Sequence, residues 1–145
     1  MAVSAKLYGL CFTQAFDKEI DLTDGNVKVM LCTSSYTPDQ DTHDYKDDVD
    51  NEVEGTGYTA GGTALANPAV AYATATNVWN FDADNVTWSS SSLTARYAVY
   101  YYNVGGTAAS SPLICYVDFG EDETSSNGDF TITHNADGIF KVTVS

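Results

Sequence analysis

Basic residues are scarce in this 145-residue sequence. Six Lys and Arg stand against 20 Asp and Glu, so the formal net charge is −14 at pH 7. The six cations are scattered along the chain, whereas nucleic acids and anionic membranes are bound by cations that act together to neutralise phosphate. The sequence therefore predicts that neither a nucleic acid nor a membrane is a partner.

Long hydrophobic runs are also missing. No segment approaches the roughly 20 apolar residues that a membrane-spanning helix needs. The apolar stretch near the N-terminus is interrupted by Lys6, Gly9 and Gln14, so it lacks the compact core of a secretion signal. We accordingly expect a chain made in the cytoplasm.

Cysteine is rare, and its pattern excludes a disulfide framework or a zinc site. The three cysteines, Cys11, Cys32 and Cys115, are an odd number and match no CxxC or Cys/His spacing. Cys32 and Cys115 lie in apolar, strand-like runs. They are interpreted as small buried side chains in a reducing compartment.

Catalytic patterns are absent as well. His43 and His134 are the only histidines, no GxSxG nucleophile motif occurs, and the cysteines have apolar neighbours. The GxG at Gly55–Gly57 is not followed by a helical pattern and is interpreted as a turn. We predict that the protein is not an enzyme.

What is present is a core-forming pattern, with 43% hydrophobic and 12% aromatic residues. Short runs rich in β-branched and aromatic residues alternate with Gly, Asn and Asp turns. This pattern predicts one all-β domain over residues 1–145, a β-sandwich or jelly-roll-like fold. The expected strands are residues 27–33, 64–76, 78–82, 86–88, 93–104, 113–119, 130–133 and 139–144.

Three segments carry more specific expectations. Residues 1–16 predict either a short helix or an extended arm, because helical spacing is interrupted by Gly9. Residues 78–88 have a hairpin signature around Asp84-Asn85. Residues 93–104 predict the longest strand. Both of its faces carry aromatic residues, so we expect it to be central or to give one face to a subunit partner.

Residues 39–54 contain eight acids and one Lys, which predicts a long, solvated loop. The segment Asp39-Gln-Asp41-Thr-His43-Asp44 resembles the alternation of oxygen donors in a Ca²⁺ loop, with Asp39, Asp41 and Asp44 as the candidate carboxylates. An EF-hand is excluded because Asp44 stands where glycine is needed and Asp50 where a bidentate Glu is needed. We expect no cofactor, and Ca²⁺ at these three aspartates is the alternative.

Aromatic residues leave a second function open. Trp79, Trp88 and the run 97–102 could line a sugar-binding face, although strands that alternate aromatic and aliphatic residues more often face a core. A glycan-binding module for host recognition is therefore kept as an alternative.

An ordered set of motifs resembles a family of small virion structural proteins of tailed bacteriophages. Together the motifs cover nearly the whole chain, from Leu7 to Val144. They are KVMLCT (28–33), YTPDQDTHDY (36–45), EVEGTGYTAGG (52–62), FDADNVTW (81–88), TARYAV (94–99) and GDFTIT (128–133) before Gly138-Ile139.

This resemblance implies a non-enzymatic capsid decoration, or cement, protein on the outer surface of the phage particle. It implies the major capsid protein or other virion proteins as partners, and a homotrimer as the favoured assembly. A tail, collar or head-fibre component is the alternative within the same class. We expect the interface in the N-terminal segment and on one tyrosine-bearing strand face, with contact residues Leu7, Tyr8, Phe12, Tyr100 and Tyr102.

Overall fold

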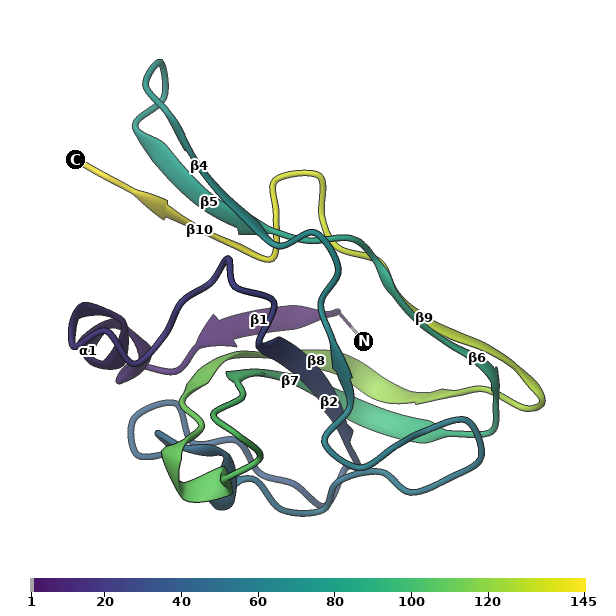
Figure 1. Ribbon diagram of the computed structural model, residues 1–145. Helices are drawn as coiled ribbons and strands as arrows, with labels where there is room; N and C mark the ends of the chain where they lie inside the picture. Colours follow the sequence, from purple (N-terminus) through teal and green to yellow (C-terminus); the bar gives the residue numbers. More distant parts are fainter. Residues whose placement is uncertain (1) are drawn as a thin grey trace.

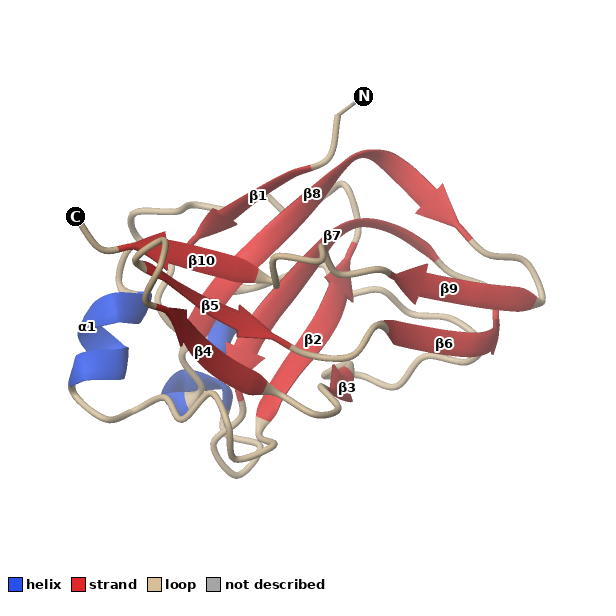
Figure 2. Ribbon diagram, turned by 90° about the horizontal axis from the view of Figure 1, so that it is seen from above, coloured by secondary structure: helices blue, strands red, loops and turns tan. Residues whose placement is uncertain are grey.

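The computed structural model describes residues 2–145 as stacked antiparallel sheets with one short α-helix, which confirms the all-β prediction. A five-stranded sheet forms one layer, and a three-stranded and a two-stranded sheet lie over it (Figures 1 and 2). The large sheet has the order β1 (Ser4–Leu7), β8 (Leu113–Thr124), β7 (Thr94–Tyr102), β2 (Val27–Cys32) and β3 (Thr63–Ala64). The smaller sheets are β10 (Phe140–Thr143), β5 (Val78–Asp82) and β4 (Ala69–Ala73), and β6 (Val86–Ser91) with β9 (Gly128–Ile132). The helices are α1 (Cys11–Phe16) and two 3₁₀ turns, η1 (Lys46–Asp48) and η2 (Ala108–Ser110).

Strand β7 is central and buried on both faces, as its double-sided aromatic pattern predicted. Ala98 and Tyr100 face the main core between the sheets. Val99 and Tyr101 face a second core on the opposite side of the same sheet. Because side chains alternate along a strand, one nine-residue strand supplies both cores.

The second core corrects the prediction of a solvated loop over residues 39–54. Tyr36, next to this segment, is 1% exposed, and Val49 packs against the same cluster. Backbone bonds fasten the segment: Gly9 N–H donates to Gln40 O at 2.9 Å, and Leu113 N–H donates to Asp44 O at 2.8 Å. Most of the acidic side chains are exposed, whereas Glu52 is half-buried and accepts from the Tyr58 hydroxyl and Gly61 N–H. The backbone of the segment covers the sheet.

The hairpin predicted for residues 78–88 is wrong. Strand β5 pairs with β4 and β10, whereas β6 pairs with β9. At the junction, Asp84 N–H donates to Ala66 O, and Asn85 Oδ1 accepts from His134 N–H. The junction residues thus bond to other segments instead of closing a turn. The chain passes on from one small sheet to the other (Figure 1).

Strand β8 is the longest, with 12 residues against nine in β7, which corrects the expected order of lengths. It continues past residue 119, where the strand was expected to end, and Glu123 pairs opposite Ala95. Gly120 has φ +86, which lets the strand pass a bulge and stay paired.

The N-terminal segment is both an arm and a helix. Strand β1 pairs along β8, with Leu7 opposite Cys115, and α1 follows after Gly9. All three cysteines are buried and free, as expected for Cys32 and Cys115.

Candidate binding surfaces

An apolar groove of about 360 Å³ opens between α1 and the three-stranded sheet. Phe12, Phe16 and Ala15 of α1 form one wall. The remaining lining is Cys11, Ile20, Leu22, Tyr72, Trp79, Ile114, Phe140, Val142 and Val144. No charged side chain lines this groove, which we call the apolar groove.

The register of the small sheet explains why its face is apolar. Tyr72, Trp79 and Val142 lie opposite one another across β4, β5 and β10. Two residues after Trp79 in β5, on the same strand face, Phe81 is fully buried in the main core. The apolar face therefore begins inside the core and continues past its edge, because alternation gives the whole strand face the same character.

Several large apolar side chains at this edge are exposed. The exposed fractions are 83% for Phe16, 52% for Val144, 49% for Tyr72 and 40% for Phe12. Single exposed apolar residues are ordinary, but a cluster around a groove is typical of a protein interaction site. The apolar groove is therefore the strongest candidate for a docking surface on this chain.

Acidic residues border one side of the groove. The segment after α1 alternates, with Ile20 and Leu22 half-buried in the groove lining and Glu19 and Asp21 exposed. Asp17 is exposed at the end of α1. The carboxylate of Glu19 accepts a hydrogen bond from the Tyr45 hydroxyl at 2.9 Å. The acidic residues of this border are therefore next to the apolar lining residues in the sequence, and the Glu19 carboxylate is directed toward Tyr45 at the start of η1.

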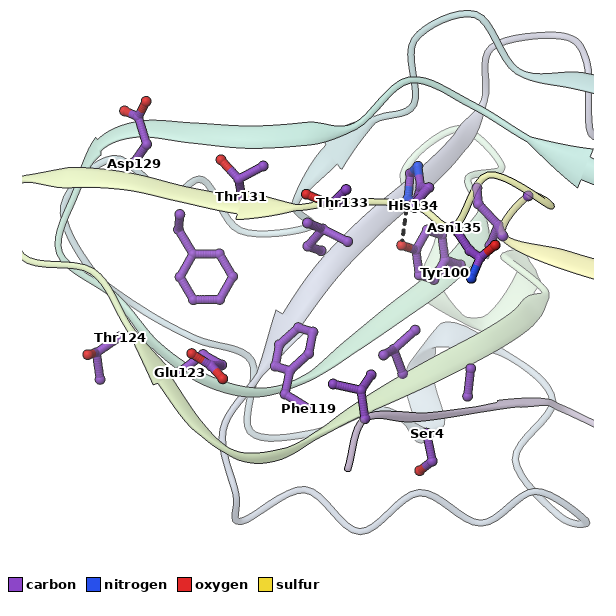
Figure 3. Close-up of a pocket in the computed structure, with 17 residues that line it drawn as sticks. Ser4, Tyr100, Phe119, Glu123, Thr124, Asp129, Thr131, Thr133, His134 and Asn135 are labelled. Carbon is purple, nitrogen blue, oxygen red and sulfur yellow. Dashed lines mark hydrogen bonds between the residues drawn. The ribbon is translucent and has the colours of Figure 1, made fainter. Parts of the chain in front are cut away.

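A second, larger hollow of about 960 Å³ lies between β9 and the strands β1 and β8 (Figure 3). Phe119 of β8 points into it, with Glu123 at its margin (Figure 3), and Phe130 of β9 also lines it. At one end, the Tyr100 hydroxyl lies 2.9 Å from His134 Nε2, and His134 Nδ1 lies 3.1 Å from Ala83 O.

The surroundings of His134 define the role of this pair. A carbonyl only accepts, so Nδ1 donates to Ala83 O, and in the neutral ring Nε2 accepts from the Tyr100 hydroxyl. Burial raises the pKa of Tyr100, which keeps its hydroxyl protonated and donating. We interpret the pair as a structural link between the central strand and the end of β9.

The predicted interface residues do not share one surface. Tyr8 and Tyr100 are 0% and 1% exposed, so they are core residues, and the expectation that they contact a partner is wrong for this chain. Leu7 is half-buried against the main core. Tyr102 is half-buried, and its hydroxyl donates to Asp24. Of the five, only Phe12 lines the apolar groove.

Of the three aspartates proposed for Ca²⁺, Asp39 is used in the local backbone structure. Asp39 Oδ1 accepts from the backbone N–H groups of Asp41 and Thr42 at 3.0 and 3.1 Å. Hydrogen bonds from the side chain of Thr42 and from these amides lower the pKa of Asp39, while partial burial raises that of Asp44. Across residues 2–145, no three His, Cys, Asp or Glu side chains gather in a way that could hold a metal ion.

The two tryptophans proposed for a sugar-binding face are separated. Trp88 is buried in the main core beside Phe130. Trp79 lies in the wall of the apolar groove and contacts Phe140. No continuous aromatic platform is formed by these two rings.

Sequence reasoning missed Phe16, Tyr72 and Val144. Alternation at Phe140, Val142 and Val144 was visible in the sequence and indicated one apolar strand face. That part of this face would remain uncovered was not visible, since coverage depends on where α1 packs.

Comparisons with protein families, curated proteins and solved structures find no match to this chain. Within residues 2–145, none of the helices has the length and apolar character required to cross a bilayer.

Proposed function

We propose that this protein is a structural component of a tailed-bacteriophage particle, a decoration protein that binds the outer head shell and stabilises it. The observation that carries the proposal is the apolar groove with Phe12, Phe16, Tyr72 and Val144 exposed around it. The all-β fold and the resemblance of the ordered motifs to those of phage virion proteins support the same proposal.

The groove suits attachment to another protein. Each large apolar side chain removed from water at an interface contributes about 1.5–3 kcal/mol. The net charge of −14 keeps the free protein soluble despite these side chains. A negative charge on the outer shell also avoids competition for the packaged DNA.

Cement proteins act by spanning neighbouring capsomers, so that expansion under DNA pressure must first break their contacts. Assembly as a trimer belongs to the proposal, because linked copies raise the effective concentration of each contact. Weak single-copy binding then becomes durable attachment.

The test is co-sedimentation of the purified full chain with expanded, DNA-free capsids of the phage that encodes it. We expect saturation at about one copy per capsid subunit or one trimer per three-fold axis, and loss of DNA at a lower temperature from particles that lack the protein. The paired substitution Phe16→Ser with Tyr72→Ser should weaken binding at least tenfold.

A matched control is Val104→Ser, since Val104 is an exposed apolar residue outside the groove. This variant should bind capsids as the wild type does. Absence of binding to capsids, or particles equally stable without the protein, contradicts decoration. Immunogold labelling at the neck or tail supports the tail, collar or head-fibre alternative, and hits on a glycan array support the sugar-binding one.

A further inference from the structure

The apolar groove and its acidic border together indicate the chemistry of a partner segment. We propose that the groove binds an apolar segment of another protein whose anchoring side chains are flanked by Lys or Arg. This inference rests on the proposed function in taking the groove as the attachment surface, and it adds the chemistry of the segment that the groove receives.

The shape and lining of the groove select apolar anchors. A volume of about 360 Å³ lies at the small end of typical ligand sites, so a few side chains fill it. Trp79, Ile114 and Phe140 lie within it and offer no charged partner. A polar anchor would lose its hydration there without gaining a hydrogen bond, which is costly.

The border selects the flanking residues. Asp17, Glu19 and Asp21 are exposed beside Phe16, Ile20 and Leu22, and Lys18 is the only cation in this segment. Asp21 Oδ1 accepts from Thr23 N–H and Oγ1 at 2.9 and 2.8 Å, and Glu19 accepts from the hydroxyl of Tyr45, which lies outside the groove lining. Carboxylates that flank apolar lining residues in the chain favour cationic groups just outside the buried anchors.

Charge also argues against a second copy as the occupant. In a two-fold contact the same surface patches face each other, so the borders would bring like charges together. Each copy carries −14, which adds repulsion. A cationic partner gains from both features.

The probes are three synthetic peptides of equal length, titrated into the full-length protein by calorimetry. The first has Phe and Leu anchors flanked by Lys, the second has the same anchors flanked by Glu, and the third has Lys flanks with the anchors replaced by Ser. Trp79 fluorescence reports occupancy, because Trp79 lines the groove while Trp88 is buried elsewhere.

We expect the Lys-flanked apolar peptide to bind at least tenfold more tightly than either other peptide at low ionic strength. This advantage over the Glu-flanked peptide should fall at 1 M salt, where the Debye length is about 3 Å. The triple variant Asp17→Lys, Glu19→Lys, Asp21→Lys should prefer the Glu-flanked peptide.

A triple variant with the same change in net charge is the control. Glu121, Asp122 and Asp129 are exposed at the other end of the molecule, on the last part of β8 and at the start of β9. Their replacement by Lys should leave the preference for Lys flanks in place. If both triple variants lose the preference for Lys flanks to the same extent, total charge sets that preference and the inference is overturned.

Three further results would overturn it: equal affinity for Lys- and Glu-flanked peptides, no binding of any peptide, or a dimer in solution that Phe16→Ser abolishes. The proposed function is judged separately. If capsid binding is unaffected by salt and by the triple variant Asp17→Lys, Glu19→Lys, Asp21→Lys, only the inference is overturned. If the peptide binds but capsids do not, only the decoration function is overturned.

Discussion

The hydroxyl of Tyr8 lies 2.8 Å from the hydroxyl of Tyr36, and both side chains are almost completely buried. This contact joins the N-terminal segment to the start of the acidic segment, 28 residues apart in the chain. The Tyr36 hydroxyl also lies 3.1 Å from His43 Nδ1, which accepts from Asp39 N–H. Nδ1 is therefore an acceptor for Tyr36, and Tyr36 accepts from Tyr8.

Removal of the Tyr8 hydroxyl should destabilise the protein. Tyr8→Phe deletes the donor and leaves Tyr36 with one unfilled acceptor position, a change that costs about 1 kcal/mol. Urea unfolding followed by circular dichroism measures it, with Tyr72→Phe as the control because that side chain is half-exposed. If the Tyr8→Phe and Tyr36→Phe effects simply add in the double variant, the two hydroxyls are not coupled.

Gly62 should tolerate no side chain. Its φ is +71, and a Cβ there would collide with the carbonyl of Val29 in the neighbouring strand β2. Gly62→Ala should abolish folding or lower stability by well over the 1–2 kcal/mol that a left-handed conformation alone costs.

The variant Gly105→Ala separates the cost of the left-handed conformation from the cost of the collision. Gly105 has φ +57 but nothing within 4 Å of an added Cβ, so this variant should show the conformational cost alone. Thermal unfolding of both proteins checks the difference. Similar melting temperatures would mean that β2 does not approach Gly62 this closely.

The Arg96–Asp118 pair should make stability depend on pH. Arg96 Nε donates to Asp118 Oδ1 at 2.6 Å, and this bond lowers the pKa of Asp118. An acid whose folded pKa is depressed stabilises the protein above its unfolded pKa of about 3.9, and the contribution is lost as pH falls through the folded pKa.

Arg96→Gln should therefore lower the urea midpoint at pH 7, and the gap to the wild type should be smaller at acid pH, because it shrinks as pH falls below the unfolded pKa of about 3.9. Lys141→Gln is the control, since the Lys141–Asp137 pair is exposed and long at 3.4 Å and should contribute little. A gap that is the same at both pH values would show that Arg96 acts only through packing.

The thiols should be unreactive in the folded protein. Burial raises the pKa of Cys11 to about 11 and, as the largest cause, that of Cys32 to about 12. The thiolate is the reactive form, so at pH 8 a disulfide reagent should modify neither at an appreciable rate. Addition of guanidinium should release three reactive thiols at once. Fast modification of Cys32 without denaturant would contradict its burial.

Several features followed from local pattern. The double-sided alternation of residues 97–102 predicted a central strand, because only a strand packed on both faces keeps aromatic residues on both. Apolar neighbours predicted the burial of Cys32 and Cys115. Gly9 correctly marked a break, although the choice between arm and helix was resolved as strand β1 followed by α1.

Pairing over long distances could not be predicted. Asp84-Asn85 has the composition of a turn, yet strand β5 pairs with β10, 59–65 residues away, and strand β6 pairs with β9, 37–46 residues away. Turn propensity is a local and weak effect, whereas the two small sheets together bury Phe81, Trp88 and Phe130 in one core. Tertiary burial therefore outweighed the hairpin signal.

The acidic segment failed as a prediction for a related reason. Most of its eight carboxylates are exposed as predicted, but the backbone and Tyr36 still cover a sheet face. Composition describes where side chains prefer to be, and backbone hydrogen bonds such as Leu113 N–H to Asp44 O decide where the chain runs.

The sequence by itself determined an acidic all-β chain with buried cysteines and an aromatic central strand, because strand alternation and composition are local properties. Only the tertiary structure decided that Tyr8 and Tyr100 are core residues and that Phe16 and Tyr72 are exposed. Both outcomes depend on which surfaces α1 and the small sheet leave uncovered. The packing of segments distant in the chain sets which surfaces stay uncovered. The periodicity within one segment contains no information about this packing.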